Sequence, residues 1–258
     1  MNGQLPPVNI TCLVCTLIAQ STHMDTHLHH DHIESHLESS DLLRDVVIGM
    51  SDGLTVPFAL AAGLSGAVDS SSIVVIAGIA EIAAGSIAMG LGGYLAGKTE
   101  QDHYKSEVKR EYDEVENLRH KEIEETKEFF ANIGLSPALQ EQATEEIAKD
   151  KDRWVDFMMK YELGLDKPDP KRATKSALNI GISYILGGII PLSPYFFISD
   201  SVEALKISVV ATLICLFIFG YFKSKVTGVN PLWGALKVTM IGALAAAAAF
   251  GVAKLIEQ

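Results

Sequence analysis

An acidic stretch near the middle of the chain places several carboxylates on one face of a predicted helix. The stretch contributes Glu111, Glu114, Glu122 and Glu125. At about 100° of rotation per residue, these four side chains fall within a stripe roughly 80° wide. Like charges on one face destabilise a helix, so the stripe requires water, basic neighbours or a bound cation. Lysines and arginines interleave with the glutamates, and a solvated acidic face is therefore the alternative to a metal site.

Soft ligands follow about thirty residues later. Met158 and Glu162 are one helical turn apart and share a face, and Met159 is adjacent to Met158. Oxygen ligands alone suit Ca²⁺ or Mg²⁺, whereas an added thioether favours Fe²⁺, Mn²⁺, Co²⁺ or Zn²⁺. Methionine in a short helix also packs into cores, and core packing is the competing interpretation for Met158.

Two more carboxylates lie inside apolar segments. Asp52 is followed by Pro57 in one segment, and Glu81 precedes Met89 by two turns in the next. A charged side chain inside a membrane is costly unless it faces protein or water. Burial raises the proton affinity of a carboxylate and a bound cation lowers it, so such a group can exchange a proton for a metal ion. A structural, hydrogen-bonded pair of acids is the alternative.

Five apolar segments determine the expected architecture. Each is about 19 to 25 residues long, which is sufficient for a helix to cross a bilayer. They lie at 46–68, 73–97, 174–198, 204–222 and 231–253, and the charged residues concentrate at 98–172. The sequence therefore predicts an all-α membrane protein with five transmembrane helices and a three-helix cytosolic metal-binding insert between spans 2 and 3. Arg44, Lys171 and Arg172 next to the spans place the N-terminus and the insert in the cytosol.

The predicted domain organisation has four parts: a disordered tail with histidines at 1–32, an amphipathic helix and spans 1 and 2 at 33–97, the insert at 98–172, and spans 3 to 5 at 173–258. The amphipathic helix covers 33–45. Within the insert, a first helix is expected to continue from span 2 to about Ala131, followed by helices at about 137–150 and 151–164. The Cys12-x-x-Cys15 motif and the histidines of the tail are weak metal signals, and a polar tail without a defined site is the favoured interpretation.

Composition excludes several classes of protein. The net charge of −11 argues against a nucleic-acid partner. A di-iron oxidase site requires Glu-x-x-His on two helices, and Glu100-x-x-His103 has no second copy in the sequence. We therefore expect neither an enzyme nor a prosthetic group, and the expected partners are membrane lipid, divalent metal ions and protons.

Two motifs on successive spans carry a resemblance to a known family. SDGLTVPFALAAGLSGA and IAEIAAGSIAMGLGGYLA, followed by an acidic helical insert, resemble the plant vacuolar iron transporters, which are related to the yeast vacuolar iron and manganese transporters. The resemblance covers about residues 33–256. It implies a five-span homodimer of the vacuolar membrane that exchanges cytosolic Fe²⁺ for lumenal protons along a path at the subunit interface, for iron storage and detoxification.

The resemblance also assigns roles to residues. It implies a transport path through Asp52, Glu81 and Met89. It implies metal binding in the insert through Glu111, Glu114, Glu122, Glu125, Met158 and Glu162, with Met159 adjacent. From Met89 to Glu111 a continuous helix would rise about 33 Å, so the insert is expected to capture or regulate metal separately from the gate. Transport of Mn²⁺ or of divalent metals broadly, and a membrane-anchored metal buffer or sensor, are the alternatives.

Overall fold

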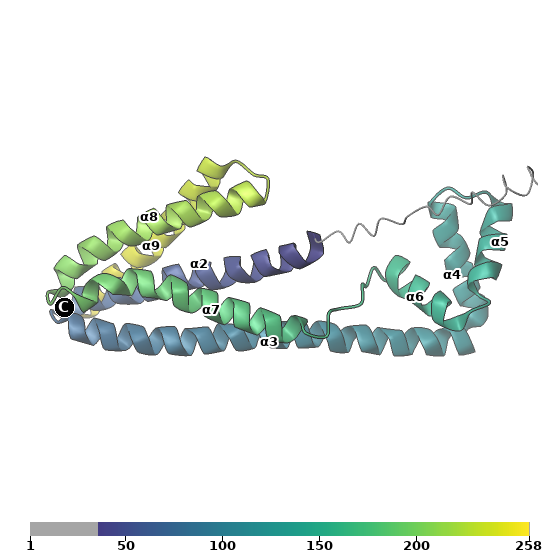
Figure 1. Cartoon of the computed structure of the whole chain (residues 1–258), viewed down its shortest axis with the longest axis horizontal. Helices are drawn as coiled ribbons and strands as arrows, with labels where there is room; N and C mark the ends of the chain where they lie inside the picture. Colours follow the sequence, from purple (N-terminus) through teal and green to yellow (C-terminus); the bar gives the residue numbers. More distant parts are fainter. Residues whose placement is uncertain (1–35, 258) are drawn as a thin grey trace, which may run out of the picture. The chain divides into compact units, whose positions relative to one another are not determined.

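The computed structural model describes residues 36–257, and helices account for nearly all of them (Figure 1). The predicted tail at 1–32, with Cys12, Cys15 and most of the histidines, lies outside the described residues. The elements are α2 (His36–Ala67), α3 (Ser71–Asn117), α4 (Arg119–Asn132), α5 (Pro137–Ile147), α6 (Lys151–Tyr161), α7 (Arg172–Leu192), the 3₁₀ turn η1 (Ser193–Phe196), α8 (Ser201–Val226) and α9 (Pro231–Glu257). Within this part of the chain there is no strand, so the all-α prediction is confirmed.

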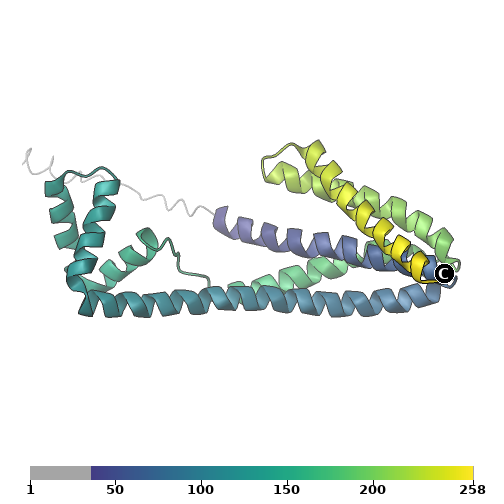
Figure 2. The same cartoon turned by 180° about the vertical axis from the view of Figure 1, so that it is seen from behind.

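Five of these helices are long and apolar enough to cross a membrane, as predicted: α2, α3, α7, α8 and α9. The expected amphipathic helix and first span are a single helix, α2, which continues through Pro57. The second span is the first half of α3, a helix of 47 residues that extends beyond the apolar bundle into the insert (Figures 1 and 2).

Helix α7 packs closely against both α2 and α3. A Cβ atom at Gly53 of α2 would collide with the backbone carbonyl of Tyr184, and one at Gly90 of α3 would come within 2.9 Å of the carbonyl oxygen of Ala177. Small residues allow two transmembrane helices to approach until their backbones are in van der Waals contact. The glycines therefore bring the segments that carry Asp52 and Glu81 against the same face of α7.

The apolar core of the bundle lies at the opposite end of α7 from the insert. Ala61 of α2, Val74 of α3, Leu192 of α7 and Ala204 of α8 are buried there together. The loops that end α2 and begin α8 are joined by backbone hydrogen bonds, including one from the amide of Ser201 to the carbonyl of Asp69. These contacts fix how α2, α3, α7 and α8 meet.

A buried ion pair joins α2 to α7 at the insert side of the bundle. The Arg172 guanidinium donates two hydrogen bonds to Asp45, at 2.6 and 2.9 Å, and Ser176 and Asn179 donate to the same carboxylate. Asp45 is 1% exposed, and its charge is compensated by these donors on α7. Removing one partner of such a pair leaves an uncompensated charge away from water, which is a large penalty.

The insert differs from its predicted form at one point that matters for the site. The first helix was expected to continue to about Ala131, but α3 ends at Asn117 and α4 begins at Arg119, with Leu118 between them at φ −121° and ψ 27°. The prediction was wrong because no glycine or proline marks the break. Helices α5 and α6 end at Ile147 and Tyr161, three residues earlier than expected in each case. The core of the insert packs Val115 of α3 against Trp154 and its neighbours on α6.

The buried ion pair generates a stability prediction. Arg172→Ala should lower the free energy of unfolding by about 3–5 kcal/mol, because Asp45 would be left buried and unpaired. Arg44→Ala is the matched control, since Arg44 is an exposed partner of Asp41 and exposed pairs contribute about 0–1 kcal/mol. Thermal unfolding of the detergent-purified variants measures the loss of stability in each. Equal losses in the two variants would contradict the structural role of the Asp45–Arg172 pair.

Candidate metal centre

Three carboxylates from three helices converge in the insert. Glu111 on α3, Glu122 on α4 and Glu162 at the end of α6 each offer an oxygen, and these oxygens lie within 4.8 Å of one another. In an uninterrupted helix, Glu111 and Glu122 are eleven positions apart and would be separated by about 16 Å along the axis. The break at Leu118 turns α4 back against α3 and makes the convergence possible.

The cluster is poor in compensating charge. Glu111 and Glu122 are each 1% exposed, and both oxygens of Glu122 and one of Glu111 are buried without a hydrogen-bond partner among the described residues. Arg110 approaches Glu111 at 3.6 Å, but it also pairs with Glu107 and Glu114. Buried charges in proteins are paired or coordinate metals, and a divalent cation among these oxygens would satisfy both the charge and the lone pairs.

Two carboxyls of the cluster, Glu122 and Glu162, have a raised pKa. Burial, together with the neighbouring charges of Glu125 and Glu111, raises the pKa of Glu122 to about 7. The same causes raise the pKa of Glu162 to about 7, although Glu162 as a residue is more exposed than Glu122. In the metal-free protein these carboxyls therefore hold protons close to neutral pH, and a cation has to displace them.

The other two glutamates of the predicted stripe flank the cluster. Glu114 and Glu125 are half-buried, and each has a basic neighbour: Arg110 lies 3.6 Å from Glu114, and Lys121 lies 2.9 Å from Glu125. The structure therefore divides the stripe into two buried members without adequate partners and two members on its rim.

Met158 and Met159 lie in the apolar core of the insert. Both are 1% exposed and pack with Val115 and Trp154. The hydroxyl of Thr126 lies 3.4 Å from the Met158 sulfur and accepts a hydrogen bond from the Trp154 indole. Core packing, the competing interpretation, is thus what the structure shows for both methionines. A ligand role for Met158 remains a proposal based on its position one turn before Glu162.

The two acids of the apolar bundle are half-buried and form no ion pair within the described residues. Tyr184 of α7 donates a hydrogen bond to one oxygen of Glu81, and the other oxygen is buried with no hydrogen-bond partner in the part of the chain that the structure describes. Glu81 also lines a groove of about 730 Å³ between α2 and α9, whose other lining residues are mostly apolar. Asp52 lies next to Gly53, where α2 contacts the Tyr184 backbone.

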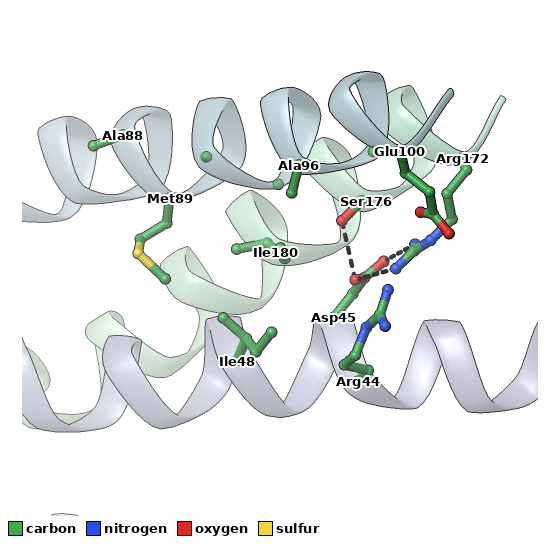
Figure 3. A pocket seen from close by; sticks show the side chains of 13 residues that line it. Arg44, Asp45, Ile48, Ala88, Met89, Ala96, Glu100, Arg172, Ser176 and Ile180 are labelled. Carbon is green, nitrogen blue, oxygen red and sulfur yellow. Dashed lines mark hydrogen bonds and ion pairs between the residues drawn. The ribbon is translucent and has the colours of Figure 1, made fainter. Parts of the chain in front are cut away.

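Met89 belongs to a different cavity. It points into a space of about 530 Å³ between α2, α3 and α7, together with Glu100 and the Asp45–Arg172 pair (Figure 3). Met89 lies about 12 Å further along α3 than Glu81. The structure therefore brings Glu81 and Asp52 against α7 at one level of the bundle, and Met89 lines a separate cavity that also extends to the buried ion pair.

Sequence reasoning did not assign a role to Asp45, Arg172 or Tyr184. Arg172 was interpreted only as a topology signal, and Asp45 was placed in the surface helix that leads into the first span. Tyr184 lies within the predicted span 3 at 174–198. The available signal was the spacing from Arg172 to Ser176 and Asn179, which puts three hydrogen-bond donors on one face of α7.

Comparisons with known proteins give the chain a family and relatives. The model of the VIT family matches residues 43–254. The chain is 49% identical over 246 residues to vacuolar iron transporter 1 of Tulipa gesneriana, covering 95% of this chain and 100% of that protein. It is 53% identical over 227 residues to vacuolar iron transporter 1 of Arabidopsis thaliana, covering 88% and 91%. It is 41% identical over 229 residues to protein CCC1 of Saccharomyces cerevisiae, covering 83% and 69%.

The raised pKa values predict pH-dependent metal binding. Raising the pH from about 6 to about 8 should strengthen Mn²⁺ binding to the purified whole protein by at least about tenfold, because the carboxyls release their protons. Calorimetric titration measures this. Glu122→Gln should weaken binding and flatten its pH dependence, whereas Glu124→Gln, an exposed change on the same helix, should do neither. Equal behaviour of the two variants would contradict the assignment of the cluster.

The same values predict the pH dependence of stability. The pKa of Glu122 rises from 4.5 to about 7 on folding, so the folded state binds the proton more tightly than the unfolded state. This contribution to stability is present below about pH 4.5 and is lost as the pH rises through about 7. Metal-free protein should therefore lose stability over this range relative to Glu122→Gln, as measured by thermal unfolding. A stability difference between the unmodified protein and Glu122→Gln that stays constant over this pH range would contradict the prediction.

Proposed function

The chain belongs to the VIT family, and we propose that it is a proton-coupled transporter that moves cytosolic Fe²⁺ into the vacuole, by Fe²⁺/H⁺ antiport, for storage and detoxification. The family and the names of the relatives indicate a transporter and not an enzyme. Iron is the proposed transported substrate, and Mn²⁺, Zn²⁺ and Co²⁺ are further ions that the carboxylate and thioether ligands can accept.

The observation that carries the proposal is the pair of half-buried acids in the apolar bundle. Asp45 has Arg172 as its counter-charge, whereas Asp52 and Glu81 form no ion pair within the described residues. A carboxylate that is withdrawn from water and lacks a cationic partner binds either a proton or a cation. Alternation between the two is the chemical basis of antiport.

The proposed path uses the two levels of the bundle in turn. Cytosolic Fe²⁺ would enter at the insert side, contact the Met89 thioether and pass to Glu81 and Asp52. The position of lysines and arginines supports a cytosolic N-terminus and insert. We assign a second copy of the chain to the apolar groove that Glu81 lines between α2 and α9, which makes the transporter a homodimer with the path at its interface.

The insert would capture metal before transport. Continuous α3 carries both Met89 and Glu111, which lie about 33 Å apart along its axis. Direct transfer over that distance is excluded, so Glu111, Glu122 and Glu162 would raise the local metal concentration or report it. A membrane-anchored buffer or sensor would use the same cluster, but it would not require Asp52 and Glu81 in the bundle.

Proteoliposomes with an imposed pH gradient test the proposal. Fe²⁺ uptake should depend on the gradient and should fall to the level of protein-free liposomes in Glu81→Gln and in Asp52→Asn, because each change removes a charge that a proton or metal must occupy. Glu203→Gln, an exposed carboxylate change at the start of α8, should transport normally. Uptake that persists after the gradient is collapsed would refute antiport, and preferential uptake of Mn²⁺ in competition would favour the manganese alternative.

Separate roles for the insert and the bundle predict a partial defect. Glu111→Ala combined with Glu114→Ala should weaken metal binding and slow uptake severalfold without abolishing it. Asp113→Ala combined with Glu116→Ala is the matched control, since it changes two exposed acids with the same spacing on the same helix. Complete loss of uptake in a well-folded Glu111/Glu114 variant would contradict the separation of roles.

A further inference from the structure

We propose that Tyr184 is a positioning residue for the metal-binding carboxylate of Glu81, an inference that rests on the proposed function. Its phenol donates a hydrogen bond to one oxygen of Glu81, across the interface between α7 and α3. The second oxygen of Glu81 is buried and has no hydrogen-bond partner among the described residues. The phenol therefore fixes the rotation of the carboxylate and leaves one oxygen available as a ligand.

The surrounding backbone is shaped to hold the phenol in place. Tyr184 is 2% exposed. A Cβ atom at Gly85, one turn after Glu81 on α3, would collide with the phenol oxygen and its ring. A Cβ at Gly53, beside Asp52 on α2, would collide with the Tyr184 backbone. Gly85 thus leaves the space that the phenol occupies, and Gly53 lets the Tyr184 backbone approach α2 beside Asp52.

The placement has a consequence for binding. A glutamate side chain that is free to rotate loses rotamer entropy when a metal binds it, whereas a carboxylate already held by a donor loses less. Hydrogen bonds to a charged group are also stronger than those between neutral groups. Tyr184 should therefore contribute to the affinity for metal, and its removal should raise KM more than it lowers the maximal rate.

The chain contains a matched control for this role. Tyr195 in η1 is also buried, at 3% exposed, and its hydroxyl lies 3.0 Å from the Ser65 hydroxyl. Its partner is a neutral serine within the apolar core, not a transport acid. Tyr195→Phe therefore removes a buried hydroxyl and one hydrogen bond, as Tyr184→Phe does, and the two variants share any general cost to the fold.

The test is Fe²⁺ uptake kinetics for the full chain in proteoliposomes. Tyr184→Phe should raise KM about tenfold and change the maximal rate by less than about twofold, while Tyr195→Phe should change neither. Equal KM values in the two variants would overturn the inference. Loss of the maximal rate in folded Tyr184→Phe would also overturn it, because Tyr184 would then take part in the transfer step itself.

A second variant keeps the test valid if Tyr184→Phe does not fold. Gly85→Ala retains the phenol but displaces it from Glu81, and it should raise KM in the same way. An unchanged KM in Gly85→Ala, with the variant folded, would overturn the inference. Absence of uptake by the unmodified protein would instead refute the proposed function, so the two failures are distinguishable.

Discussion

A carboxylate that is withdrawn from water must find a compensating charge or hold a proton, and the structure meets this constraint in three different ways. Asp45 is fully compensated by Arg172, Ser176 and Asn179. Glu81 accepts a hydrogen bond from Tyr184 at one oxygen, and its other oxygen has no partner among residues 36–257. In the insert, Glu111 and Glu122 have buried oxygens with no hydrogen-bond partner among the described residues. The degree of compensation separates a structural acid from acids that remain available to a cation.

The architecture positions these groups through one long helix. Helix α3 carries Glu81 and Met89 within the apolar bundle and Glu111 in the insert, and glycines along it allow α7 to pack closely. The ion pair between Asp45 and Arg172 fixes α2 against α7 beside the cavity that Met89 lines (Figure 3). In the bundle, the buried charge of Asp45 is paired and holds two helices together. In the insert, the buried charges of Glu111 and Glu122 lack sufficient partners and are available to a cation.

Much of this was predictable from the sequence because the signals are local. Apolar length alone located five spans, and the glutamate stripe included two of the three carboxylates that converge in the insert, Glu111 and Glu122. The break at Leu118 was not predictable, since the segment has the composition of a continuous helix and the break is favoured by packing of α4 and α6 against α3. The role of Met158 and Met159 was also ambiguous, because methionine occurs at the same helical spacing in an apolar core and in a metal site. The partners of Asp45 and Glu81 come from α7, more than a hundred residues away.

The most direct test of this account is to locate bound metal in the protein itself. A structure of the full chain soaked with Mn²⁺ near pH 8 should show anomalous scattering among Glu111, Glu122 and Glu162 and at the free oxygen of Glu81, and none at Asp45. Scattering at these carboxylates would establish that metal binds where the charge of a buried carboxylate lacks sufficient partners. Saturating metal with no scattering among the three insert glutamates, or with scattering at Asp45, would contradict it.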